Sequence, residues 1–202
     1  SVKQSGPKSK IIEAEGKSIF DAIRNAKDRL ANRLYFGNMN LIVLGETLAR
    51  EDGISDTIDW ILREAEARET IDLVISKAKT AREVLTVQGT DQKLLSLEIT
   101  GIVVENNQAT SSTAHVELYT VYNILHCPGE SLTLPAFTIV QNAKEQTAQA
   151  EGIAAFKADK LVGFLTPEQS KAFLLATGQA QGGVFTLSLS GIGPDDVALE
   201  IL

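Results

Sequence analysis

A histidine and the single cysteine of this chain, His126 and Cys127, are neighbours in the sequence. A thiol beside an imidazole is a pair that nucleophilic catalysis uses, because the ring can accept the proton of the thiol. Catalytic pairs usually meet through the fold, however, and the side chains of adjacent residues rarely face one another. We therefore interpret the pair as the end of a helix with a partly buried thiol, and we predict no catalytic residue.

The two histidines, His115 and His126, are also the first places to look for a metal site. Protein zinc sites combine three or four His, Cys, Asp or Glu side chains. His115 stands at a polar helix start where the sequence gives it no acidic partner, and one thiol cannot supply a cysteine-rich site. We expect neither a bound metal ion nor a cofactor.

A charged cluster follows an apolar helical segment near the middle of the first half of the chain. Its members are Arg63, Glu64, Glu66, Arg68 and Glu69. The usual interpretation is a solvated face with weak ion pairs. Alternatively, Arg63 and Arg68 bind acidic groups of a partner, because arginine forms directional pairs. Trp60 is either a core residue or an interface anchor. Trp60, Arg63 and Arg68 are therefore the possible interface residues.

The elements that must position these residues alternate between helix and strand. Capping boxes of Ser18 with Asp21 and of Thr80 with Glu83 predict the starts of two helices. Residues 41–44 predict a fully buried strand, because the run is too short for a helix. The other expected elements are a short strand at 11–12, helices at 46–50, 55–63 and 80–85, and a strand at 70–76. Such long connections favour a sheet that is partly parallel and covered by helices.

The second half of the chain changes from helical to β-rich texture. Residues 94–104 are ambiguous, because a glycine and β-branched residues interrupt the helical spacing. A helix is expected over 114–125, with Leu118, Tyr122 and Leu125 on one face. The expected later elements are a strand at 134–140, a hairpin of 152–156 and 161–165, a helix from the Thr166 cap to Gly178, and strands near 185–189 and 197–202.

Together these elements predict a mixed α/β (α+β) fold with two domains, each a mixed β-sheet with helices packed on it. We place the boundary near Leu134, so that residues 1–134 form the first domain and residues 135–202 a smaller second one. The chain begins at Ser1 without an initiator methionine and stops at Leu202 inside an expected strand. We expect a fragment whose second domain runs into the start of a third.

Composition excludes several classes of function. Hydrophobic residues make up 44% of the chain, which is enough for a core, and the net charge is −7. A nucleic-acid-binding protein needs a basic stripe, and here the Lys and Arg residues are scattered among more numerous acids. The longest clean apolar run, residues 41–44, falls far short of the roughly 20 residues of a membrane span. We therefore expect a soluble segment that binds no nucleic acid.

Several stretches, taken in order, resemble the Ger(x)C family of spore germination proteins. Any one of them is weak evidence, but their ordered occurrence from Glu15 to Gly183 is specific. The matching stretches are 15–24, with the sequence EGKSIFDAIR, then 34–37, 44–49, 60–63, 66–68, 73–77, 81–85, 132–135, 151–157 and 160–165, the last with the sequence KLVGFL.

The resemblance implies a lipoprotein of three domains, anchored by its lipid on the outer face of the spore inner membrane. It also implies action beside two integral-membrane partners, the A and B subunits of a nutrient germinant receptor. The cysteine that carries the lipid in that family is absent here, as are the first strand and most of the third domain; a partner segment could complete the first sheet. Position 38 is Asn where the family often has His.

We therefore expect a non-enzymatic subunit that acts in spore germination through assembly with those partners. The alternative is a domain that binds a small nutrient in a pocket between the two domains. A third hypothesis, an enzyme acting on spore-wall glycans, would need two carboxylates across a cleft. Candidates such as Glu46 and Asp59 cannot be distinguished from surface acids in the sequence.

Overall fold

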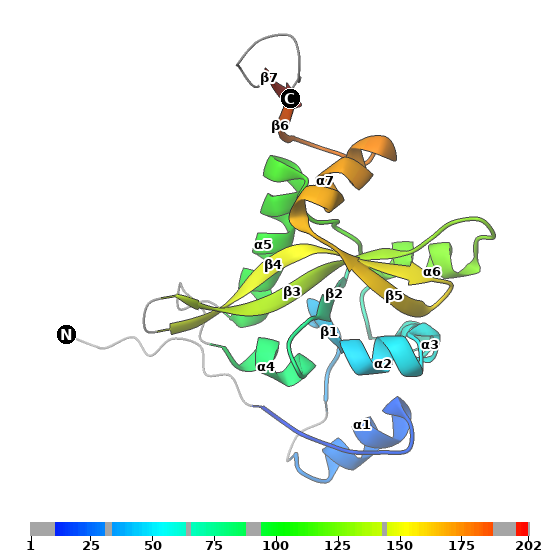
Figure 1. Ribbon diagram of the computed structural model, residues 1–202. Coiled ribbons are helices and arrows are strands. Elements are labelled where there is room, and N and C mark those ends of the chain that lie inside the picture. The colour runs from blue at the N-terminus through cyan, green and yellow to red at the C-terminus, as the bar shows by residue number, and fades with distance from the viewer. Residues whose placement is uncertain are drawn as a thin grey trace.

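The computed structural model describes residues 11–30, 34–63, 66–87, 94–142, 145–187 and 197–201. Within these ranges the chain forms seven helices and seven strands (Figure 1). In chain order they are α1 (Ile19–Lys27), β1 (Leu41–Gly45), α2 (Glu46–Glu51), α3 (Ser55–Arg63), β2 (Asp72–Ser76), α4 (Ala81–Thr86), α5 (Leu95–Thr110), α6 (Leu118–His126), β3 (Thr133–Asn142), β4 (Glu145–Lys157), β5 (Lys160–Leu165), α7 (Pro167–Ala176), β6 (Gly183–Leu187) and β7 (Val197–Ile201).

The centre of the molecule is one mixed sheet with the strand order β1-β2-β3-β4-β5 among the described residues. β1, β2 and β3 run parallel, whereas β3, β4 and β5 form an antiparallel meander. The parallel component is confirmed. The expectation of two separate mixed sheets is wrong, because the second sheet, β6-β7, has two antiparallel strands. The main sheet crosses residue 134, which lies inside β3, and the division of the chain into domains at that residue stays a prediction.

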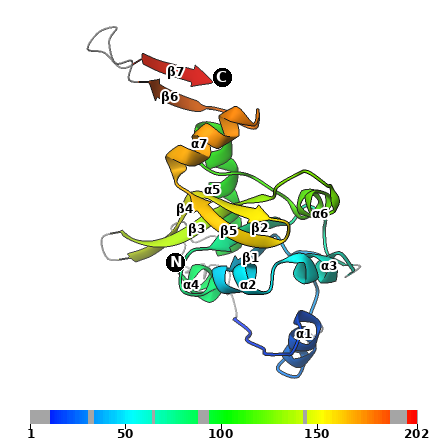
Figure 2. The ribbon, with the colours of Figure 1, turned by 45° about the vertical axis from the view of Figure 1, so that its right-hand side comes forward.

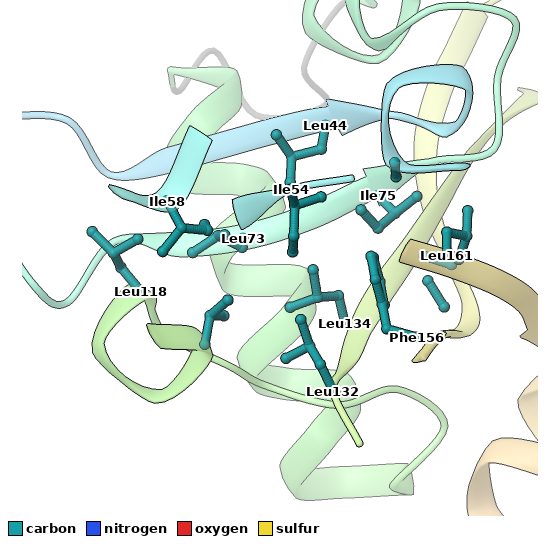
Figure 3. Packing of buried hydrophobic residues seen from close by; sticks show 14 of the residues in the cluster. Leu44, Ile54, Ile58, Leu73, Ile75, Leu118, Leu132, Leu134, Phe156 and Leu161 are labelled. Carbon is teal, nitrogen blue, oxygen red and sulfur yellow. The ribbon is translucent and has the colours of Figure 1, made fainter. Parts of the chain in front are cut away.

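Helices cover both faces of the sheet, as the alternating side chains of β2 show. Leu73 and Ile75 point into the larger core, which is formed with α2, α3 and α6 (Figure 3). Val74 points to the opposite face and packs with Val84 of α4 and with α5. Every residue of β2 is buried. A central parallel strand covered on both sides reads as a continuous apolar run for this reason.

Strand β4 contributes to both cores because it changes face along its length. Ala150 packs with the α4–α5 side, and Ala154 packs with the α2–α3–α6 side. Residues an even number apart in a regular strand share a face, so the strand must hold one extra residue between them. Gly152 lies there with φ of 78°. The register against β3 shifts at the same place, between Pro135 and Phe137.

The helix starts follow the predicted caps. Ser18 accepts a hydrogen bond from the amide of Asp21, and Thr80 accepts one from the amide of Glu83. Thr166 forms a full capping box with Gln169 at the start of α7. These caps satisfy backbone amides that have no partner inside the helix.

Two expectations needed the structure to decide them. The ambiguous stretch 94–104 is helical, as the first part of α5. Its glycine, Gly101, faces open space and so does not interrupt the helix. The strand expected at 11–12 is wrong, since those residues have no regular secondary structure.

Two parts of the fold stand away from the main sheet (Figures 1 and 2). α1 lies at one end of the molecule and touches α3. The β6-β7 hairpin lies at the other end, beyond α7. Among the described residues, no helix combines the length and the apolar composition that crossing a bilayer requires.

Candidate interaction surface

Trp60 packs against the core on one side and borders a groove on the other. Its half-buried side chain packs against the larger core. The edge of its ring meets the ring of Phe36, with the centroids 5.7 Å apart and an angle of 81° between the planes. Its outer part lines a groove between α1 and α3 with a volume of about 730 Å³. One side of Trp60 is thus held by the core, and the other side is accessible from the groove.

Arg63, at the end of α3, lies at the junction of two hollows. Its side chain is 81% exposed and stands 3.5 Å from the carboxylate of Asp59. It lines the α1–α3 groove together with Trp60, and it also lines a second hollow beside α6. Arg68 is exposed in the following loop, and it is not among the residues that line either hollow. The structure therefore brings together two of the three predicted interface residues.

The second hollow, the α3–α6 groove, has a volume of about 610 Å³. Its lining residues are Asp59, Leu62, Arg63, Glu69, Tyr119, Tyr122, Asn123 and His126. Tyr119 is 46% exposed and Tyr122 is 39% exposed. The rings of Tyr122 and His126 stack with centroids 4.2 Å apart, and Nδ1 of His126 lies 2.8 Å from the carbonyl of Tyr122. This wall of the groove is therefore aromatic.

Sequence reasoning missed the tyrosines of α6 as surface residues. The residues of α6 buried in the core are Leu118 and Val121, and Leu125 is partly buried. Tyr119 and Tyr122 are displaced from that stripe and face outward. The helix begins at Leu118 rather than at residue 114. The spacing of Leu118, Val121 and Leu125 is the signal that defines its inner face.

His126 and Cys127 end α6 on the exposed side of the molecule. The hydrogen bond of His126 is with the backbone of its own helix, and its ring stacks on Tyr122. Cys127 is exposed, contrary to the expectation of a partly buried thiol. His126 lines the α3–α6 groove, and Cys127 is not among the residues that line it.

His115 has the acidic neighbours that the sequence did not reveal. Its Nε2 atom lies 2.9 Å from Oδ1 of Asp72, a residue that is distant in sequence but adjacent in the fold. The hydrogen bond with Asp72 raises the pKa of His115, partial burial opposes this, and the charges of Asp72 and Glu117 add to the rise. The premise that His115 stands without acids is therefore wrong, although no finding tests the prediction that no metal binds.

Two family models of spore germination proteins match this chain. The family model described as "Spore germination protein N-terminal domain" matches residues 1–139. A second, described as "Spore germination B3/GerAC like, C-terminal", matches residues 151–202. The first alone covers more than half of the chain.

A curated relative and a solved structure point the same way. "Spore germination protein KC" of Bacillus subtilis (strain 168) is 24% identical over 178 residues, which cover 81% of this chain and 44% of that protein. A crystal structure of the GerBC protein superposes with a TM-score of 0.51 at 20% identity, over 90% of this chain and 50% of that one. The chain spans about half the length of both. The resemblance found in the sequence is confirmed: the chain belongs to the GerAC family of spore germination proteins.

Proposed function

We propose that this chain is part of a non-enzymatic lipoprotein subunit of a nutrient germinant receptor, and that it assembles with the integral-membrane A and B subunits on the outer face of the spore inner membrane. The observation that carries the proposal is the α3–α6 groove, where Arg63, Tyr119 and Tyr122 form an open surface and the opposite side of α6 is buried in the core. The location and the partners follow from the family resemblance.

The residue types of this surface suit protein association. Tyr, Trp and Arg are the residues that most often dominate the binding energy of an interface. Tyrosine offers a large apolar area together with a polar end, and loses little side-chain entropy on binding. Arg63 lies at the mouth of the groove with most of its side chain free of protein contacts, apart from the Asp59 pair. It can therefore pair with an acidic group of a partner.

The candidate carboxylates for glycan hydrolysis are each paired with an arginine of their own helix. Glu46 accepts a hydrogen bond from Arg50 at 2.7 Å, and Asp59 pairs with Arg63. Both are contacts one turn apart on a single helix, of the kind common on exposed helix surfaces. This supports an assembly role over a hydrolytic one.

The test uses the full-length protein in spores, with Arg63→Ala and Tyr122→Ala introduced separately. Each removes an exposed side chain and leaves the core intact. We expect the A and B subunits recovered with the variant after detergent extraction to fall by about tenfold, the effect of losing one interface residue worth more than 1 kcal/mol. Germination in response to nutrients should slow in parallel.

The matched control is Arg82→Ala on α4, at the opposite face of the sheet, where the arginine is 62% exposed and paired with Glu13. This variant should recover both subunits at the wild-type level. If Arg63→Ala and Tyr122→Ala reach wild-type abundance and assemble as well as Arg82→Ala, this surface is not the interface.

A second function, binding of a small nutrient, is favoured by a different hollow. Residues of the first predicted domain, among them Asn107 and His115, line it together with Leu174 and Gln181 of the second, around a volume of about 540 Å³. Adding germinants to the purified chain should raise the melting temperature if one binds there. Unchanged melting curves with a panel of amino acids, sugars and nucleosides would count against this function.

A further inference from the structure

Three potential metal ligands meet where β2 begins and α6 begins. They are Asp72, His115 and Glu117, and their candidate ligand atoms all lie within 4.8 Å of one another. Asp72 comes from the sheet, whereas the other two come from the segment that leads into α6. The cluster is separate from the α3–α6 groove, since none of its three members lines that groove.

The backbone holds the two segments in a fixed relation. Asp72 and Glu117 form an isolated antiparallel bridge. On either side of it, the amide of Leu73 donates to the carbonyl of Val116 and the amide of Leu118 donates to the carbonyl of Ile71. The positions of the three ligands are therefore set by main-chain hydrogen bonds before any ion binds, as a pre-organised site requires.

The loop before His115 is also tied down. Thr113 donates its hydroxyl proton to the carbonyl of Gly152 at 2.8 Å, and Asn107 donates its amide to the carbonyl of Thr113 at 3.1 Å. Both residues are buried. The segment that carries His115 is consequently fixed to α5 and β4, and its approach to Asp72 does not depend on a loose loop.

The electrostatics favour a cation. The side chain of Asp72 is only 6% exposed, and a carboxylate removed from water is unstable unless a positive group compensates it. Glu117 adds a second carboxylate nearby. The side chain of His115 is 31% exposed and borders the 540 Å³ hollow, so an ion has a path from solvent.

We propose that Asp72, His115 and Glu117 bind one divalent transition-metal ion, with Zn²⁺ the best match. An imidazole and two carboxylates suit zinc, whereas Ca²⁺ and Mg²⁺ take oxygen ligands. Nε2 of His115 and Oδ1 of Asp72 lie 2.9 Å apart in a hydrogen bond, and two ligands about 2 Å from a tetrahedral zinc ion lie about 3.3 Å apart, so the two atoms need to separate by only a few tenths of an ångström. Binding of the ion displaces the proton of the hydrogen bond between these two atoms to solvent. Glu117 supplies the third protein ligand. Water from the hollow completes the coordination.

The ion would act as a structural clamp between β2 and α6. Because α6 carries Tyr119 and Tyr122, the clamp would also fix the wall of the α3–α6 groove. The site itself does not depend on any partner that this groove binds.

The experiment measures Zn²⁺ binding to the purified chain after treatment with a chelator, by titration calorimetry and by metal analysis after dialysis. One zinc ion per chain is expected. His115→Gln should abolish binding, and Glu117→Gln, at the ligand of intermediate burial, should weaken it by about tenfold or more, as loss of groups at a metal site does. Circular dichroism confirms that each variant is folded, and the Glu117 variant decides the matter if His115→Gln does not fold.

Two variants control for adventitious binding at the exposed end of α6. His126→Gln and Cys127→Ser remove the other histidine and the thiol, and both should bind zinc like the parent chain. Loss of binding in these variants, with binding retained in Glu117→Gln, would overturn the proposal. So would a parent chain that retains no zinc after dialysis, in which case Asp72 and His115 form an ion pair only.

Discussion

The hydroxyl of Ser111 donates a hydrogen bond of 2.7 Å to the carbonyl of Gly182. The hydroxyl oxygen of Ser111 in turn accepts hydrogen bonds from the amides of Gln181 and Gly182. Ser111 is fully buried and adopts a left-handed conformation with φ of 47° just after α5. One side chain thus fastens the end of α5 to the segment between α7 and β6.

Replacing Ser111 by Ala should lower the free energy of unfolding by about 1–3 kcal/mol, because buried backbone groups lose their partner. Urea denaturation of the purified chain measures the change. Ser131→Ala, at an exposed position, is the control and should leave the midpoint unchanged. Equal midpoints for both variants would show that the Ser111 contacts do not stabilise the fold.

Gly152→Ala should destabilise the chain more than a surface change. A Cβ atom there would meet the carbonyl of Leu165, and the φ of 78° is strained for any residue with a side chain. The cost of that backbone conformation is about 1–3 kcal/mol, to which the steric contact adds. Thermal unfolding measures the loss, with Gly163→Ala, where a Cβ meets nothing within 4 Å, as the control.

Gly101→Ala should have the opposite effect. Gly101 lies inside α5 with nothing within 4 Å of the added Cβ atom. Alanine favours the helix over glycine by about 1 kcal/mol. The urea midpoint should therefore rise; a fall would mean that α5 does not extend through this residue.

Glu168 should make α7 sensitive to acid. A hydrogen bond from its own backbone amide, and then one from the Thr166 hydroxyl, hold the pKa of this exposed carboxylate below its usual value of 4.5. A lowered pKa means that the charged form stabilises the fold above the unfolded pKa, and that this contribution is lost as the pH falls through the folded pKa. Glu168→Gln should be slightly less stable than the parent at neutral pH.

In strong acid the two proteins should have the same urea midpoint, because the parent has then lost the charge as well. Glu130→Gln, in an exposed loop away from any helix start, is the control and should differ little from the parent at either pH. A difference for Glu168→Gln that persists in acid would contradict the assigned cause.

Local signals in the sequence predicted most elements correctly, since caps and short apolar runs act over a few residues. Ser18, Thr80 and Thr166 mark helix starts that the structure contains. The arrangement of the strands was not predictable in the same way. β2 and β3 pair across a long stretch of sequence, and the sequence does not show that the strands after residue 132 extend the first sheet.

The candidate sites also divide into features that local sequence signals reveal and features that depend on long-range contacts. Trp60 and Arg63 were predicted as interface candidates because their residue types alone suggest interfaces, and this stays a prediction. The contact of His115 with Asp72 was not found, because it depends on the bridge that places residue 117 beside residue 72. The outward tyrosines of α6 were missed because Tyr122 follows Leu118 by four residues, a spacing that also fits a buried face, whereas the buried stripe runs through Val121 on the other side of Leu118.

The parallel pairing of β2 with β3 bears on how the protein is made. On the ribosome, β2 emerges before α4, α5 and α6, and its neighbour β3 follows only after them. At about 5–20 residues per second, the nascent strand waits several seconds with the edge that pairs with β3 still unpaired. During that interval the growing polypeptide is most exposed to aggregation, and a chaperone that shields it would act before β3 leaves the exit tunnel.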